Sequence, residues 1–281
     1  MPKPVDKDDK TWPYTFHGID LLSSGTNENV GQCPLCGQEG KFSLNGSTGQ
    51  WRCFMCQETG NLQSFIQKFW TACSMHTEER YYKELCKERG LLSPKSLQSW
   101  GLCLSTTTGR WLAPGYRVNG NIGTLYHYTR VKRRDSFRNA FLPTPTLGHY
   151  LYGVPLYESR WNTVYLCEGC WDGIALWEVI GAKNNVLATP GCGIFEEIWL
   201  QLFAGKKVCL MFDNDHPYQH PKTGEMMPPA GLEGMKRVAS ILMNSPSPPA
   251  EVSYLRWGEL GYNEALPDGH DVRDFLREGT K

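Results

Sequence analysis

Apolar positions in the first half of the chain recur at helix or strand spacing and predict short, separate elements. In residues 60–70, GNLQSFIQKFW, the apolar side chains lie three or four positions apart, which predicts an amphipathic helix. Residues 77–90, TEERYYKELCKERG, predict a charged helix that ends at its glycine. Residues 111–118 and 122–131 predict two strands around an Asn-Gly-Asn turn. Residues 1–31 are polar and weakly patterned, so we expect a loose lead-in there.

The pattern changes at residue 163, where short apolar runs begin to alternate with helical segments. Such alternation is typical of a parallel sheet whose strands are connected by helices. The expected strands begin near residues 163, 185, 206 and 252, and the expected helices near residues 172, 195 and 231. The predicted fold class is therefore α/β in this part of the chain and α+β before it.

Composition and charge narrow the class of protein. The 281 residues are 40% hydrophobic and 12% aromatic, which excludes a disordered or low-complexity chain. The 29 Lys and Arg balance 29 Asp and Glu, but residues 1–140 have a basic excess of six and residues 141–281 an acidic excess of six. One half could attract phosphates and the other cations, although a chance pattern of solvated faces explains the asymmetry equally well. We expect no membrane insertion or secretion, because no apolar run reaches ~18 residues and the first ten residues contain no apolar signal region.

Two Cys-x-x-Cys pairs, Cys33 with Cys36 and Cys53 with Cys56, are separated by 16 residues. The sequence between them, KFSLNGSTGQWR, suits a β-hairpin. Four thiolates complete a tetrahedral Zn²⁺ site without an open position, so the spacing predicts a structural zinc ribbon. Four nearby side chains either stack on and grip a nucleic acid strand or form the ribbon's core and solvated rim, and the spacing does not decide between these interpretations: Lys41, Trp51, Arg52 and Phe54.

Three acidic residues follow two of the expected parallel strands. Glu168 comes directly after TVYLC, and Asp213 and Asp215 come after KKVCLMF. Ligand sites in parallel α/β sheets lie beyond the carboxyl ends of the strands, so these side chains lie where chemistry is expected. Three carboxylates with no histidine suit Mg²⁺ or Mn²⁺, since hard cations prefer oxygen ligands. A lone Asp-x-Asp is more often a turn, but two acidic motifs at strand ends together predict a metal site.

Several segments resemble segments of the bacterial and phage-type DNA primases, and they follow one another in the same order as in that family. Residues 166–176, LCEGCWDGIAL, are similar to the first signature of the TOPRIM domain, and residues 212–215, FDND, to the second. Other segments extend the resemblance: the cysteine ribbon followed by GNLQSFI, residues 120–139, LYG at 151–153, AGLEGMKR at 230–237 and PDGHDVRDFL at 267–276. The chain is most similar in these features to the primase half of phage primase-helicases.

The resemblance implies three domains. A zinc-ribbon domain with a trailing helix would span residues 1–75, the basic N-terminal subdomain of an RNA polymerase core 76–160, and a TOPRIM domain with a mainly parallel sheet 161–281. The implied activity is synthesis of short RNA primers from ribonucleoside triphosphates on a single-stranded DNA template during DNA replication. No G-x-x-x-x-G-K-[ST] motif occurs, so a replicative helicase is an expected partner on a separate chain. The resemblance also implies a cytoplasmic location in a bacterial or phage-infected host cell.

The same resemblance implies roles for individual residues. Glu168, Asp213 and Asp215 would hold catalytic Mg²⁺ or Mn²⁺, and Asp172, together with Asp271, would support them. The zinc bound by the four cysteines would be structural. The basic side chains expected to hold the triphosphate and the template are Arg130, Lys132, Arg133, Arg134 and Arg138.

Two other functions share most of these features. A TOPRIM nuclease or topoisomerase-like enzyme would use the same acids to break phosphodiester bonds, although a topoisomerase also needs a tyrosine nucleophile domain for which 281 residues leave little space. A non-catalytic single-stranded DNA-binding protein would need the ribbon and the basic stretch but not the acids. The products formed from single-stranded DNA and ribonucleotides distinguish the three functions.

Overall fold

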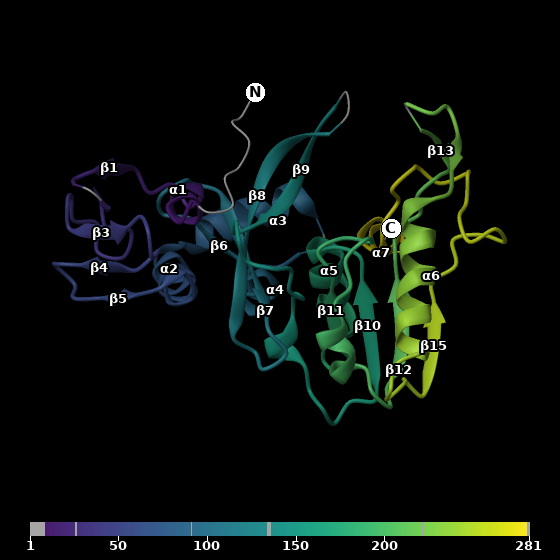
Figure 1. Ribbon diagram of the computed structural model, residues 1–281. Helices are drawn as coiled ribbons and strands as arrows, with labels where there is room; N and C mark the ends of the chain where they lie inside the picture. Colours follow the sequence, from purple (N-terminus) through teal and green to yellow (C-terminus); the bar gives the residue numbers. More distant parts are fainter. Residues whose placement is uncertain (1–8, 26, 91, 134–135, 221, 280–281) are drawn as a thin grey trace. The chain divides into compact units, whose positions relative to one another are not determined.

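The computed structural model describes residues 9–25, 27–90, 92–133, 136–220 and 222–279. They belong to two compact units, the first made of residues 1–81, 101–115 and 122–148 and the second of 82–100, 116–121 and 149–281. The predicted mixture of α+β and α/β structure is confirmed, because antiparallel sheets precede a parallel sheet along the chain (Figure 1). The three-domain division stays a prediction. No helix of the described ranges is both long and apolar enough to cross a membrane.

The first unit opens with a five-stranded antiparallel sheet in sequential order, the zinc ribbon. The lead-in expected over residues 1–31 is wrong for its described part, which contains a helix and two strands. The reason is tertiary: Tyr14 is buried, its ring centroid lies 4.8 Å from that of Phe65, and its hydroxyl donates to the carbonyl of Gly49 at 2.7 Å. The elements are α1 (Trp12–Phe16), β1 (Leu21–Ser23), β2 (Glu28–Gly31), β3 (Phe42–Asn45), β4 (Trp51–Cys53) and β5 (Thr59–Gly60).

The predicted helix after the ribbon is confirmed as α2 (Leu62–His76). Its N-cap is Asn61, whose side chain accepts from the backbone N–H of Ser64 at 3.1 Å. The buried face contains Phe65 and Phe69, which stack with ring centroids 5.5 Å apart. This face packs on the ribbon and on β8, and it explains the helical spacing of the apolar residues in the sequence.

A second antiparallel sheet has the order β6-β7-β8-β9. Strand β8 extends further than the sequence pattern predicts. Its residues 126–133 pair with β9, a strand that the pattern did not predict (Figure 1). Charged residues interrupt the apolar alternation near the tip of this hairpin, so local periodicity gives no strand signal there. The strands are β6 (Cys103–Leu104), β7 (Trp111–Tyr116), β8 (Ile122–Arg133) and β9 (Ser136–Pro143).

The second unit contains the predicted parallel sheet, with strand order β11-β10-β12-β15. The central strand β10 pairs in parallel with β11 and β12, and Leu166 lies opposite both Leu187 and Leu210. All three leucines are buried, as expected for a sheet covered on both faces. The strands are β10 (Thr163–Cys167), β11 (Asn185–Ala188), β12 (Lys207–Met211) and β15 (Glu251–Tyr254).

Helices and short elements complete this unit. The segment expected to be a helix from residue 195 forms only the short 3₁₀ helix η2, and an unpredicted hairpin of β13 and β14 follows β12 (Figure 1). The elements are α3 (Glu79–Arg89), which begins in the first unit, α4 (Pro94–Ser99), η1 (Val154–Leu156), α5 (Cys170–Ile180), η2 (Glu197–Leu202), β13 (Tyr218–Gln219), β14 (Met226–Met227), α6 (Ala230–Met243) and α7 (Val272–Glu278).

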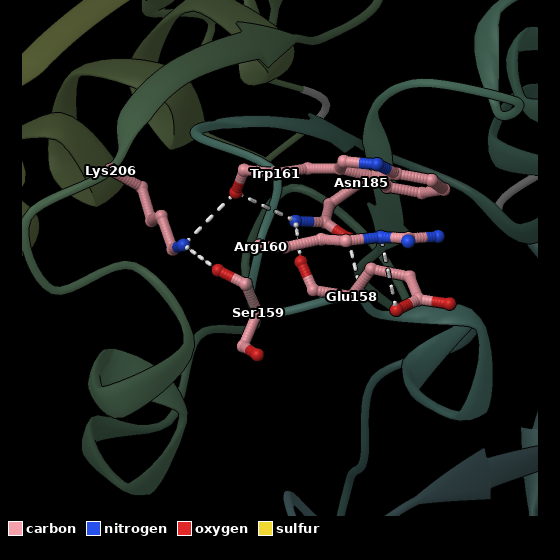
Figure 2. Close-up of polar contacts among 6 residues, drawn as sticks. All are labelled: Glu158, Ser159, Arg160, Trp161, Asn185 and Lys206. Carbon is pink, nitrogen blue, oxygen red and sulfur yellow. Dashed lines mark hydrogen bonds and ion pairs between the residues drawn. The ribbon is translucent and has the colours of Figure 1, made fainter.

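A network of hydrogen bonds fixes the loop that leads into β10 (Figure 2). The buried amide of Asn185 accepts from the backbone N–H of Glu158 at 2.7 Å and donates to the carbonyls of Glu158 and Trp161. The ammonium of Lys206 donates to the carbonyls of Ser159 and Trp161. The same loop thereby joins the starts of β10, β11 and β12. The carboxyl ends of these strands lie level with one another because Cys167 pairs with both Ala188 and Met211.

Candidate functional site

The four predicted zinc ligands converge in the first unit. Among the described residues, they form the one group of three or more His, Cys, Asp or Glu whose ligand atoms all lie within 4.8 Å of one another. Cys33 and Cys36 follow β2, while Cys53 ends β4 and Cys56 follows it. The set of four sulfur donors fits a closed, structural Zn²⁺ site.

The two Cys-x-x-Cys turns have nearly the same backbone geometry. Gly37 and Gln57, each the residue after a second cysteine, adopt left-handed φ angles of 74° and 62°. Their N–H groups donate to the carbonyls of Cys33 and Cys53 at 2.8 and 3.1 Å. Burial disfavours the thiolate of Cys53, but backbone N–H groups that donate to its sulfur lower its pKa to about 7. The second turn therefore favours the thiolate of Cys53, whereas burial raises the pKa of the Cys33 thiol in the first turn.

The structure decides which aromatic residues of the ribbon belong to its core. Trp51 is buried, stacks on Phe42 with ring centroids 5.6 Å apart, and donates through its indole N–H to the carbonyl of Asn61 at 2.9 Å. Phe54 is half exposed, and the guanidinium of Arg52 lies 4.1 Å from the centre of its ring. Trp51 is thus a core residue, whereas Arg52 and Phe54 offer an exposed cation and aromatic ring.

The acidic residues meet at one end of the parallel sheet in the second unit. Cys167 lies opposite Met211 in the register of β10 and β12, so Glu168 and Asp213 leave neighbouring strands at nearly the same level. The backbone N–H of Asp213 donates to the Glu168 carboxylate at 3.3 Å. The sequence correctly predicted this meeting, because parallel strands bring their carboxyl ends together.

Helix α6 approaches these carboxylates at a glycine. The backbone N–H of Gly231 donates to Asp215 at 2.7 Å. A Cβ atom on Gly231 would lie 2.6 Å from the carbonyl oxygen of Asp213 and 3.2 Å from the Glu168 carboxylate. Only glycine therefore allows the first turn of α6 to approach the acids so closely. Sequence analysis did not assign this residue a role.

The electrostatics of the acidic centre favour a bound cation. Burial and the charge of Asp215 raise the pKa of Glu168 to about 7. Burial and the charge of Glu168 likewise raise the pKa of Asp213. The Oδ1 atom of Asp213 is buried and has no hydrogen-bond partner among the described residues. A divalent cation would supply that missing partner and offset the repulsion, and carboxylate oxygens are the donors that Mg²⁺ and Mn²⁺ prefer. Among the described residues, however, the ligand atoms of the three acids do not gather as closely as those of the four cysteines.

Two further carboxylates lie at the N-terminal ends of helices α5 and α7. Asp172, in the first turn of α5, is buried, and its pKa is raised by burial and by the neighbouring charge of Asp271. Asp271 caps α7 by accepting from the backbone N–H of Asp274 at 2.8 Å, and it also accepts from Arg273 at 2.8 Å. One carboxylate oxygen of Asp172 is buried and has no hydrogen-bond partner among the described residues. Asp172 lies near both the start of α7 and the acidic centre, because the charges of Asp271 and Glu168 both act on it.

The basic stretch lies on the hairpin of β8 and β9 in the first unit, and the structure divides it between two faces. Arg130 pairs with Asn139, and Val131 pairs with Arg138. Because side chains alternate along a strand, Arg130 and Lys132 share one face and Arg138 lies on the other. All three are exposed. Arg133 ends β8, and Arg134 lies outside the described residues.

An aromatic pair adjoins Arg130 on the same face of the hairpin. Tyr128 lies opposite Phe141 in the register, and their ring centroids are 5.0 Å apart. Sequence analysis missed this pair because β9 was not predicted. Tyr128 and Phe141 are partly buried, while Arg130 and Lys132 are exposed. Aromatic rings beside exposed cations are typical of surfaces that bind single-stranded nucleic acid.

Neither a family model nor a curated protein sequence matches this chain. Among solved structures, the Escherichia coli primase catalytic core is similar with a TM-score of 0.50 and 14% identity over 78% of this chain and 76% of that one. The RNA polymerase domain of the Mycobacterium tuberculosis primase has a TM-score of 0.50 and 13% identity over 77% of each chain. The primase fragment of the bacteriophage T7 primase-helicase protein has a TM-score of 0.46 and 17% identity over 92% of this chain and 96% of that one.

The similarity to the E. coli and M. tuberculosis structures covers more than three quarters of this chain. The parallel sheet with acids at its carboxyl end is consistent with the expected TOPRIM arrangement. The chain therefore has the fold of the catalytic cores of bacterial DNA primases, which confirms at the level of the fold the resemblance found in the sequence.

Proposed function

We propose that this protein is a DNA primase that makes short RNA primers from ribonucleoside triphosphates on single-stranded DNA during replication. The observation that carries the proposal is the acidic centre: Glu168, Asp213 and Asp215 meet at the ends of adjacent parallel strands, and one buried oxygen of Asp213 lacks a partner. The primase-like fold supports the same activity.

Primer synthesis joins the 3′-hydroxyl of one nucleotide to the α-phosphate of the next and releases pyrophosphate. This chemistry depends on charge neutralisation and in-line positioning more than on a protein nucleophile. Bound Mg²⁺ or Mn²⁺ would supply that neutralisation. Glu168, Asp213 and Asp215 would hold the cation, and the backbone N–H of Gly231 orients Asp215. Asp172, whose pKa responds to the charge of Glu168, would support them.

The hairpin of β8 and β9 would hold phosphates of the template and of the incoming triphosphate. Arg130 and Lys132 follow the ring pair of Tyr128 and Phe141 on one face, so bases could stack while the cations contact the backbone. Further phosphate contacts would come from Arg133, Arg134 and Arg138. The exposed Arg52 and Phe54 of the zinc ribbon offer a second place for template contact.

The proposal includes partners and a location. Single-stranded DNA and ribonucleoside triphosphates would be the substrates, with Zn²⁺ structural and Mg²⁺ or Mn²⁺ catalytic. A replicative helicase on a separate chain would bring the protein to the template. The setting would be the cytoplasm of a bacterial or phage-infected host cell.

Primer synthesis is tested with single-stranded DNA, radiolabelled ribonucleotides and Mg²⁺ or Mn²⁺, followed by separation of the products on a gel. A ladder of short RNAs that depends on template and on Asp213 supports the proposal. Cleaved DNA without RNA products would instead indicate a TOPRIM nuclease or topoisomerase-like enzyme. Bound but unchanged DNA would indicate a non-catalytic binding protein, and either of these two outcomes would contradict the proposal.

A further inference from the structure

The turn that carries Asp213 and Asp215 is fastened to a later part of the chain through the residue between them. Asn214 is fully buried. Its side-chain carbonyl accepts from the backbone N–H of Asn263 at 2.7 Å, and its amide nitrogen donates to the carbonyls of Asn263 at 3.1 Å and Pro267 at 3.3 Å. The backbone of one segment, residues 263–267, thus binds both ends of this carboxamide.

The backbone of Asn214 binds the continuation of that segment. Its N–H donates to the carbonyl of His270 at 2.8 Å, and its carbonyl accepts from the N–H of Gly269 at 2.9 Å, so Asn214 and His270 form an isolated antiparallel bridge. The backbone N–H of His216 donates to the Asp268 carboxylate at 2.8 Å. The turn is therefore held both at Asn214 and two residues further on.

A bridge of this kind sets the directions of the neighbouring side chains. Successive side chains of extended backbone point to opposite sides, so Asp213 and Asp215 project away from the segment that Asn214 binds. The contact of Asp215 agrees with this, because its carboxylate accepts from the N–H of Gly231 in α6 at 2.7 Å. Asp213 follows the same alternation, and its buried Oδ1 atom has no hydrogen-bond partner among the described residues. Fastening Asn214 on one side thus directs both carboxylates to the other.

We propose that Asn214 is a positioning residue that holds the Asp213 and Asp215 carboxylates in the orientation needed to bind a divalent cation. This inference rests on the proposed function in that it takes these two acids as ligands. Asn214 acts through the backbone that the three residues share, and it lies behind the ligands rather than around the ion. Groups behind metal ligands control affinity because they fix the ligand geometry before the ion arrives.

The chemistry of the site explains why an asparagine occupies it. One backbone N–H needs an acceptor and two carbonyls need donors, and a carboxamide supplies both in one planar group. An aspartate would keep the acceptor but lose both donors, and it would add a negative charge to a buried acidic centre. A leucine of similar volume would leave all three backbone groups unpaired.

The same sheet contains a matched control at its opposite end. Asn185 is also fully buried, accepts from one backbone N–H and donates to two backbone carbonyls (Figure 2). It begins β11, whereas the acids follow the carboxyl ends of β10 and β12. Replacing either asparagine by Ala therefore removes the same kinds of hydrogen bond, in one case beside the acids and in the other case far from them.

The test measures Mn²⁺ binding to the full-length, zinc-containing protein at constant pH by electron paramagnetic resonance of free Mn²⁺. Asn214→Ala should raise the dissociation constant about ten- to hundred-fold, the range for groups that orient a metal ligand. Asn185→Ala should lower the melting temperature by a similar amount but keep the dissociation constant within about two-fold of the wild type, because distant sites act independently. At saturating Mn²⁺, the spectrum of the bound ion should change in Asn214→Ala only, since it reports the geometry of the ligands.

Two outcomes would overturn the inference. Wild-type Mn²⁺ affinity in Asn214→Ala would remove the positioning role, and an equal loss of affinity in Asn185→Ala would make the effect one of general stability. If Asn214→Ala does not fold, Asn214→Ser takes its place, because a hydroxyl keeps one donor and one acceptor. Asn214→Ser should weaken Mn²⁺ binding by a smaller factor, and unchanged affinity in that variant would again contradict the inference.

This measurement separates the inference from the proposed function, because it needs neither template nor ribonucleotides. A wild-type protein that makes no primers but loses Mn²⁺ affinity in Asn214→Ala would retain the positioning role and refute the primase proposal. A protein that makes primers but binds Mn²⁺ equally well in both forms would do the reverse.

Discussion

Buried ionisable side chains have opposite consequences in the two units. In the second unit, carboxylates repel one another in a buried site, and a bound cation would offset that repulsion. In the first unit, His17 and His127 are fully buried and hydrogen-bonded to each other at 2.8 Å, and His17 also contacts Thr144 at 3.0 Å. Burial disfavours the charged form of both imidazoles, so these histidines stabilise the fold only while they are neutral.

Asp213→Asn should abolish primer synthesis at low divalent-ion concentration while leaving DNA binding nearly unchanged. The amide keeps the size of the side chain but removes one charge needed to hold the cation. By general estimate, a bound cation lowers the free energy of the charged transition state by several kcal/mol. The apo protein should become slightly more stable, because one repelling carboxylate is gone. Primer gels, DNA-binding titrations and melting curves measure these effects. If Asp213→Asn made primers at the wild-type rate, residues 213–215 would be a turn and not a metal site.

Stability of the first unit should fall as the pH decreases from 7 to 5. Burial and the charge of Arg110 lower the pKa of His127 to about 3, and burial together with His127 lowers that of His17. The unfolded chain takes up protons below about pH 6.5 while the folded state does not, so protonation favours unfolding. For His127 this amounts to about 2 kcal/mol at pH 5, and His17 acts in the same direction. Full stability is therefore present above pH 6.5.

The free energy of unfolding, measured with urea at each pH, should depend less steeply on pH in His127→Gln than in the wild type. Because zinc ligands also take up protons, the comparison is made between variants with equal zinc content. His76→Gln, at the exposed end of α2, should keep the wild-type slope. Equal slopes in His127→Gln and the wild type would show that the buried pair does not control the pH dependence.

Pairing between strands determines what the ribbon and the basic hairpin present to solvent. In the ribbon, pairing of β3 with β4 places Phe42 opposite Cys53 and so couples the aromatic core to the zinc ligands. In the hairpin, pairing of β8 with β9 separates Arg130 from Arg138 although both belong to one basic stretch of sequence. The register of each strand pair thus determines which side chains can act together.

Cys53→Ser should lose the zinc and unfold the ribbon while sparing the second unit. A structural zinc ion supplies folding free energy to a small module, and the remaining core around Trp51 is too small to replace it. Elemental analysis and hydrogen exchange measure both effects. Cys86→Ser, in α3, should retain zinc, and a wild type that contains no zinc after purification would contradict the predicted site.

Replacing Arg130 and Lys132 together by Ala should weaken single-stranded DNA binding and reduce its salt dependence. Loss of two phosphate contacts should lower the slope of log affinity against log salt by about 1.4, since ~0.7 counterion is released per contact. Arg138→Ala should lower the slope by at most half as much, because it removes one cation from the other face. Fluorescence anisotropy at several salt concentrations gives the slopes, and an unchanged slope in the double variant would place both side chains away from the template.

The candidate zinc site and the proposed cation site lie in different units, so we expect the whole molecule to respond differently to the two metals. The cysteine site belongs to the first unit and the acidic site to the second. A structural metal controls whether its module folds, whereas a catalytic cation stabilises only the state that binds it.

Adding Mg²⁺ to zinc-containing protein freed of other divalent ions should slow hydrogen exchange in the second unit only. The protected amides should lie near Asp213 and Gly231, whose N–H groups already contact the acids. At ten times the dissociation constant the stabilisation is about 1.4 kcal/mol. Asp213→Asn should remove the protection, and equal protection of the first unit would contradict separate sites.

Features that depend on neighbouring residues were predictable from the amino-acid sequence. The spacing of the four cysteines predicted the zinc site, the periodicity of apolar residues predicted α2 and the parallel strands, and the rule for strand ends predicted that Glu168 and Asp213 meet. Each of these inferences needs only the geometry of a turn, a helix or a parallel sheet, which is the same in every protein.

Features that depend on contacts between distant segments were decided only by the tertiary structure. Helix α1 forms in a weakly patterned stretch because its Tyr14 packs on Phe65, and β9 exists because β8 pairs with it despite its interrupted pattern. Local sequence gives no signal for such contacts, since their free energy arises from side chains that packing brings together across long separations along the chain.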